Sequence, residues 1–109
     1  MYYYNAKLIR IIDGDTIEAL VDLGFSTRKE VIVRLYGIDT PETRTKDLLE
    51  KEKGLAAKER LSQLLRGGEF ELESLGVDKY GRCLGRIFVA TLDINKTLLN
   101  EGHAREYYG

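Results

Sequence analysis

The chain has 109 residues, 43% of them hydrophobic, which is enough to bury the core of one domain over residues 1–109 but not of two. Its 17 basic and 18 acidic residues give a formal net charge of −1, which excludes a uniformly basic surface that binds nucleic acid by bulk electrostatics. One cysteine, Cys83, excludes an internal disulfide, and with one histidine it excludes a Cys/His zinc site within the chain.

The chain is predicted to begin with an antiparallel meander of three strands. Loosely alternating apolar and polar residues predict a strand over 2–12. The Asp13-Gly14 pair after it is a strong hairpin signal, because glycine accepts a positive φ. A second strand is predicted over 16–23 and a third over 29–38, with a turn over 24–28 between them.

After Pro41 the pattern changes to helical spacing. An amphipathic helix is predicted over 53–66, ended by two glycines, because its apolar residues fall on one face. These apolar residues are Ala57, Leu61, Leu64 and Leu65. The segment 44–53 is mostly charged, so it is expected to be an exposed loop.

The remaining segments complete a barrel pattern. Strands are predicted over 69–75 and 83–89 with a loop over 76–82 between them, and Asn95 is predicted to cap a short helix over 96–101. Three strands, a helix and two strands is the order of an OB-type barrel. We therefore predict a β-rich α+β fold: a five-stranded OB-fold barrel with a helix between strands three and four and a short C-terminal helix.

Four acidic residues lie at two turns that a meander brings to the same end of the barrel: Asp13, Asp15, Asp39 and Glu42. Hard divalent cations take oxygen ligands from such clusters, and calcium tolerates irregular geometry. Pro41 restricts its own φ and that of its neighbour, which holds the second turn in a defined shape. The alternative is that Asp13-Gly14-Asp15 serves only as a hairpin turn.

Arg34 lies in a strand whose alternate positions are apolar, where an unpaired guanidinium would be costly. A carboxylate or phosphate partner is therefore expected, and a buried ion pair with one of the acids is the alternative to a phosphate. An extended strand would separate Arg34 from Asp39 by about 16 Å, so both face one ligand only if the strand bends. Gly37 is the expected position of that bend.

The loop 78–82 supplies a second basic residue, Arg82, with Tyr80 beside it. It lacks the lysine, the Ser/Thr and the following helix of a P-loop, which excludes a nucleoside-triphosphate site of that type. His103 follows the end of the last predicted helix, away from the acids, and is interpreted as a surface residue. Glu42 then remains as the candidate general base.

Together these segments resemble the thermonuclease family, also called staphylococcal nuclease-like domains. The resemblance lies in Asp13-Gly14-Asp15-Thr16, in Arg34-Leu35 with Ile38-Asp39-Thr40-Pro41-Glu42-Thr43, and in Asp78-Lys79-Tyr80-Gly81-Arg82. It implies an OB-fold, calcium-dependent nuclease that acts as an endo- or exonuclease on the phosphodiester bonds of DNA and RNA.

The resemblance also implies a metal site. Asp15 and Asp39 would ligate Ca²⁺ through their carboxylates, and Thr40 through its backbone carbonyl. Asp13 and Glu42 would contact water bound to the metal, with Glu42 as the general base.

On the substrate side, the resemblance implies that Arg34 and Arg82 bind the scissile phosphate and stabilise the phosphorane. Lys79 and Tyr80 resemble contacts to a neighbouring phosphate, and Tyr108 resembles a base-stacking tyrosine. Stacking accepts any base, so little sequence specificity is expected.

Two alternatives to a nuclease stay open: a catalytically silent OB-fold module that binds nucleic acid or protein, and a purely structural calcium site. The expected partners are single-stranded or unpaired DNA and RNA, without a membrane, and the chain is expected to be a monomer. Residues 1–5 lack the features of a signal peptide, so a cytoplasmic protein is expected, secreted or membrane-tethered only if a leader has been removed.

Overall fold

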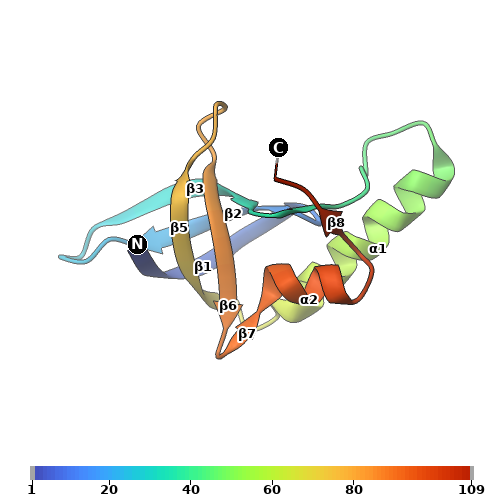
Figure 1. Ribbon diagram of the computed structural model, residues 1–109. Coiled ribbons are helices and arrows are strands. Elements are labelled where there is room, and N and C mark those ends of the chain that lie inside the picture. Colours follow the sequence, from blue (N-terminus) through green and yellow to red (C-terminus); the bar gives the residue numbers. More distant parts are fainter. Residues whose placement is uncertain (1, 109) are drawn as a thin grey trace.

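The computed structural model describes residues 2–108 and contains a closed β-barrel (Figure 1). Its sheet has the strand order β3-β2-β1-β5-β6-β7, and a parallel pairing of β3 with β6 closes it. The strands are β1 (Tyr2–Asp13), β2 (Thr16–Asp22), β3 (Arg28–Leu35), β5 (Glu69–Val77), β6 (Cys83–Val89) and the two-residue β7 (Leu92–Asp93). Strands β3, β2, β1, β5 and β6 form the closed barrel and β7 only extends it beside β6, so the predicted five-stranded barrel is confirmed.

A short second sheet and two helices complete the described chain. Strand β4 (Ile38–Asp39) pairs with β8 (Arg105–Glu106). Helix α1 (Leu48–Leu64) lies between β4 and β5, and α2 (Ile94–Asn100) follows β7, as the order predicted. Figure 1 shows both helices on the same side of the barrel, whereas the loop between β5 and β6 projects from it. Neither helix has the length and apolar character needed to cross a bilayer.

The core lies inside the barrel and beneath the helices. Its fully buried side chains come from alternate strand positions and from one face of each helix, and include Ile17, Val33, Leu35, Leu61, Leu72, Ile87, Ile94 and Leu98. Removing such a side chain from water stabilises the fold by about 1.5–3 kcal/mol, so this layer supplies the main driving force. A Cβ on Gly85 would lie 2.5 Å from Leu72 Cδ1, so the Leu72 side chain would have to move to admit one.

The start of α1 differs from the prediction. The helix begins at Leu48 rather than at residue 53, so only the first part of the charged segment 44–53 is a loop. Asp47 is the N-cap: its Oδ1 accepts hydrogen bonds from the backbone N–H groups of Leu49 (3.0 Å) and Glu50 (3.3 Å). Capping satisfies two otherwise unpaired donors, and it starts a helical turn without apolar periodicity.

The start of α2 also differs, and the prediction that Asn95 caps the helix is wrong. Asp93 caps it, because Asp93 Oδ1 accepts from the N–H of Lys96 at 3.1 Å. Asn95 is instead buried inside the first turn. Its Nδ2 donates to the carbonyls of Tyr36 (2.9 Å) and Gly85 (3.0 Å).

The third strand is interrupted near its predicted end. β3 stops at Leu35, and Gly37 takes a φ of +83°, which confirms this glycine as the bend. The chain then resumes as β4, and the backbone N–H of Tyr107 donates to Gly37 O at 3.0 Å. The expected C-terminal tail is therefore attached to the bend through β8.

Candidate active site

The first hairpin turn and the end of β3 lie together at one end of the barrel. Thr16 is opposite Arg34 in the β2–β3 register, and the N–H of Leu35 donates to Asp15 O at 2.8 Å. After the bend at Gly37, the N–H of Thr40 donates to Asp15 Oδ2 at 3.1 Å. Two segments that are separate in the sequence thus share a carboxylate.

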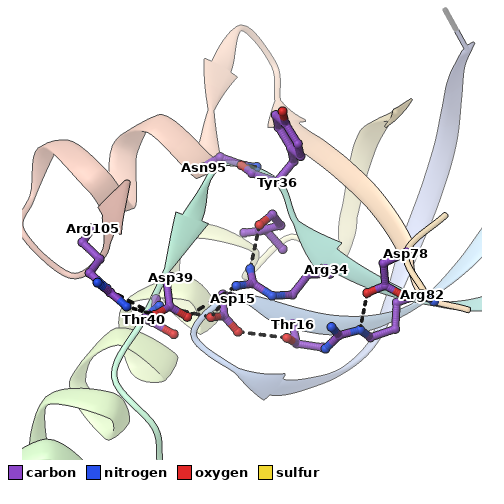
Figure 2. Close-up of polar contacts among 11 residues, drawn as sticks. Asp15, Thr16, Arg34, Tyr36, Asp39, Thr40, Asp78, Arg82, Asn95 and Arg105 are labelled. Carbon is purple, nitrogen blue, oxygen red and sulfur yellow. Dashed lines mark hydrogen bonds and ion pairs between the residues drawn. The ribbon is translucent and has the colours of Figure 1, made fainter. Parts of the chain in front are cut away.

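Arg34 reaches two of the predicted metal ligands, Asp15 and Asp39 (Figure 2). Its Nη2 is 3.4 Å from Asp15 Oδ2 and 3.4 Å from Asp39 Oδ1, and its Nη1 donates to Leu35 O at 2.8 Å. The hydroxyl of Thr16 donates to Asp15 Oδ1 at 2.9 Å. The side chains of Arg34 and Asp15 are only 13% and 11% exposed, so the buried ion pair left open by the sequence is present.

These residues line a cavity of about 220 Å³. The cavity also contains Glu42 and Arg82, which come from the loop after β4 and the loop before β6. Its complete lining is Asp13, Asp15, Thr16, Arg34, Asp39, Thr40, Pro41, Glu42, Thr43, Arg44 and Arg82. The predicted metal-binding and phosphate-binding residues therefore converge.

The loop that carries Glu42 is held on two sides. Asp13 Oδ1 accepts a hydrogen bond from the Thr43 hydroxyl at 2.6 Å, which connects the loop to the first hairpin. A Cβ on Gly54 would lie 2.6 Å from Glu42 O and 2.7 Å from Pro41 O, so α1 packs directly against this backbone. Only glycine permits that approach. A lone glycine within a helical pattern is the feature that could have indicated this contact from the sequence.

The loop 78–82 positions Arg82. Asp78 Oδ2 accepts from Arg82 Nε at 2.7 Å, and Asp78 Oδ1 accepts from the backbone N–H groups of Tyr80 and Arg82, both at 2.9 Å. Desolvation is the largest single influence on the pKa of Asp78 and raises it, but the hydrogen bonds from Arg82 and Tyr80 together hold that pKa below its usual value. The Asp78 carboxylate is thus the organising group of this loop.

A second cavity, of about 440 Å³, adjoins the first and shares Arg34 and Arg82 with it. Its lining is rich in aromatic side chains and includes Lys79, Tyr36, Tyr80, Tyr107 and Tyr108. The Tyr36 and Tyr108 rings meet edge to face with centroids 5.6 Å apart. The three remaining predicted substrate residues, Lys79, Tyr80 and Tyr108, therefore lie in this groove rather than in the acidic cavity.

The oxygen donors of the first cavity fit a hard divalent cation. Within residues 2–108 no three Asp, Glu, His or Cys side chains gather as a metal site, so carboxylates alone do not form one. The resemblance, however, implied two carboxylates, Asp15 and Asp39, with a backbone oxygen of Thr40. Among the residues that the structure describes, the Thr40 hydroxyl oxygen is buried without a hydrogen-bond partner, which leaves an unsatisfied oxygen in this segment. Carboxylate and carbonyl oxygens are ligands that calcium prefers.

Sequence reasoning missed three residues that shape the site: Gly54, Asn95 and Arg105. It also placed His103 too far from the acids. A third cavity, of about 720 Å³, is lined by His103 and Arg105 together with Asp39 and Glu42. The C-terminal segment thus borders the site because β8 pairs with β4.

The fold and the site define a class of protein: an OB-type barrel with an acidic and arginine-lined cavity at the end where its first hairpin turn meets the bend after β3. The chain belongs to the staphylococcal nuclease family, because residues 32–109 match the family described as Staphylococcal nuclease homologue. The expected family is therefore confirmed.

Several named relatives are similar over most of the chain. Endonuclease YncB of Bacillus subtilis is 36% identical over 107 residues, covering 95% of this chain and 48% of the relative. A micrococcal nuclease of Shigella flexneri is 32% identical over 117 residues (97% and 61%), and a thermonuclease of Staphylococcus hyicus is 35% identical over 101 residues (91% and 57%). The chain thus spans about half the length of these relatives.

Proposed function

We propose that this chain is a calcium-dependent nuclease that hydrolyses phosphodiester bonds of DNA and RNA with low sequence specificity. The observation that carries the proposal is a single cavity lined by Arg34, Arg82 and Glu42, with Asp15 and Asp39 beside them. Guanidinium groups bind phosphate oxygens, and a carboxylate within reach of the same position is a candidate base. The names of the nuclease relatives support the same reaction class.

The chemistry follows from how charge develops on the phosphate. Attack by water builds negative charge on a five-coordinate phosphorus, so Arg34 and Arg82 stabilise the transition state more than the ground state. Glu42 accepts the proton of the attacking water. Asp15, Asp39 and the Thr40 carbonyl would hold Ca²⁺, which when bound supplies positive charge beside the phosphate and makes a nearby water more acidic.

The aromatic groove supports the substrate assignment. Lys79, Tyr80 and Tyr108 line it, with Lys79 Nζ 5.2 Å from the centre of the Tyr80 ring, and the exposed Tyr108 ring is the candidate stacking surface for a nucleobase. Stacking requires a base that has left its partner, so we propose single-stranded or unpaired nucleic acid as the substrate. Every base has a π-face, which accounts for low specificity.

Glu42→Gln tests the proposal. We expect cleavage of fluorescent single-stranded DNA in Ca²⁺ to fall by about 10²–10⁴-fold, the usual contribution of a general base. Glu52→Gln, an exposed carboxylate of α1 outside the cavity, is the matched control and should keep wild-type activity. Excess chelator should abolish wild-type cleavage.

Three other outcomes would contradict the proposal in different ways. Wild-type activity in Glu42→Gln would remove Glu42 from the reaction. Binding of single-stranded DNA without cleavage would indicate the silent OB-fold module. A melting temperature raised by Ca²⁺ with neither binding nor cleavage would indicate a purely structural metal site.

A further inference from the structure

Of the ion pairs of the site, the one between Arg105 and Asp39 joins the residues that are farthest apart in the sequence, 66 positions. Arg105 lies in β8 directly opposite Asp39 in β4, so the backbone pairing brings the two side chains together. Arg105 Nη2 is 3.1 Å and Nε 3.3 Å from Asp39 Oδ2. Figure 2 shows this guanidinium reaching Asp39 from the side opposite to Arg34.

The two oxygens of Asp39 therefore face two different guanidinium groups. Oδ1 faces Arg34 at 3.4 Å, and Oδ2 faces Arg105. A carboxylate that ligates a cation must release at least one such partner or keep a positive charge beside the cation. Binding of Ca²⁺ by Asp39 therefore carries a free-energy cost, either the loss of an ion pair with an arginine or the repulsion between that arginine and the cation.

Of the two arginines, Arg105 is the easier to displace. Its side chain is 74% exposed, whereas that of Arg34 is 13% exposed and is also held by Asp15 and by Leu35 O. Exposed ion pairs contribute little stability, because water and salt screen them. The cavity of about 720 Å³ beside Arg105 is lined by further carboxylates, Asp47 and Glu50, so a displaced guanidinium would stay among acidic side chains.

We propose that Arg105 competes with the cation for Asp39. It is a positioning residue: it holds the carboxylate before the cation binds, and its charge sets how tightly the cation is then held. The inference rests on the proposed cation site, but it concerns affinity rather than cleavage. It predicts that removing the charge of Arg105 strengthens cation binding, although one contact to a ligand is lost.

The test is calorimetric titration of the complete chain with Ca²⁺, without nucleic acid. We expect Arg105→Gln to bind Ca²⁺ about three- to tenfold more tightly than wild type, the range for removing a screened charge a few ångströms from a divalent ion. Arg105→Lys keeps the charge and should stay near wild type. The gain in Arg105→Gln should shrink as salt rises, which a merely structural role would not produce.

Arg60→Gln is the matched control. It removes another two-point ion pair, to Glu101 at 2.7 and 2.9 Å, which lies outside the cavity of Asp39. Its Ca²⁺ affinity should equal that of wild type.

Affinity in Arg105→Gln equal to or weaker than wild type overturns the inference, and weaker binding would show that Arg105 only supports Asp39. If wild type binds no Ca²⁺, the inference fails together with the proposed cation site. If Arg105→Gln binds more tightly but no variant cleaves DNA, the inference stands and the proposed nuclease activity fails.

Discussion

Asn95→Ala is expected to destabilise the protein far more than a typical surface change. The Asn95 amide donates to the carbonyls of Tyr36 and Gly85, and its Oδ1 accepts from the N–H of Ile87 at 3.2 Å. Gly85 O keeps a second partner, the N–H of Tyr36 at 2.9 Å. The alanine variant therefore loses the main partner of two backbone groups, Tyr36 O and the Ile87 N–H.

Each buried polar group left without a partner costs about 1–3 kcal/mol, so the expected loss is about 3 kcal/mol. That is a large part of the 5–15 kcal/mol of unfolding free energy typical of a small domain. The loss also loosens the bend at Tyr36, against which the Tyr108 ring packs.

The assay is equilibrium unfolding in urea followed by circular dichroism. Asn100→Ala is the matched control, because Asn100 is an exposed residue at the end of the same helix, and we expect a change below about 0.5 kcal/mol. A loss below about 1 kcal/mol in Asn95→Ala would refute the reasoning that this amide connects β6, α2 and the bend.

Two further predictions concern the loops of the site. Gly54→Ala should lower the free energy of unfolding by about 1–3 kcal/mol, because the new Cβ would press on Glu42 O and Pro41 O. This loss should exceed the gain from the better helix propensity of alanine. Thermal unfolding measures the change, and an unchanged or higher melting temperature would contradict the prediction. Asp78→Asn should weaken binding of single-stranded DNA in a fluorescence anisotropy titration, because the variant has a weaker acceptor for Arg82 Nε. The pKa of Asp78 is lower in the folded chain than its usual value, so its stabilisation is complete above the unfolded pKa of about 4 and disappears as the pH falls through the folded pKa. The melting temperatures of wild type and Asp78→Asn should therefore differ at neutral pH and converge in acid, and a constant difference would exclude this role for Asp78.

The local pattern of apolar and turn residues was sufficient to predict most strands of the barrel. The strand over 83–89 has the predicted bounds, since alternating side chains bounded by a glycine-containing loop define a strand locally. The start of α1 was missed because its first turn is set by a cap at Asp47, while Leu48 and Leu49 are exposed and carry no apolar period. Asn95 was misassigned because asparagine is a common cap, and only contacts with distant strands show that it is buried.

The sequence by itself determined the order of strands and helices and the acids, arginines and tyrosines available for chemistry, because turn signals and side-chain periods are local properties. Only the tertiary structure decided which acid faces which arginine. Arg105 and Asp39 are separated by 66 positions, and they meet because the bend at Gly37 turns β4 toward the C-terminal strand. Such a pairing depends on strand register across the whole fold, which no short stretch of sequence contains.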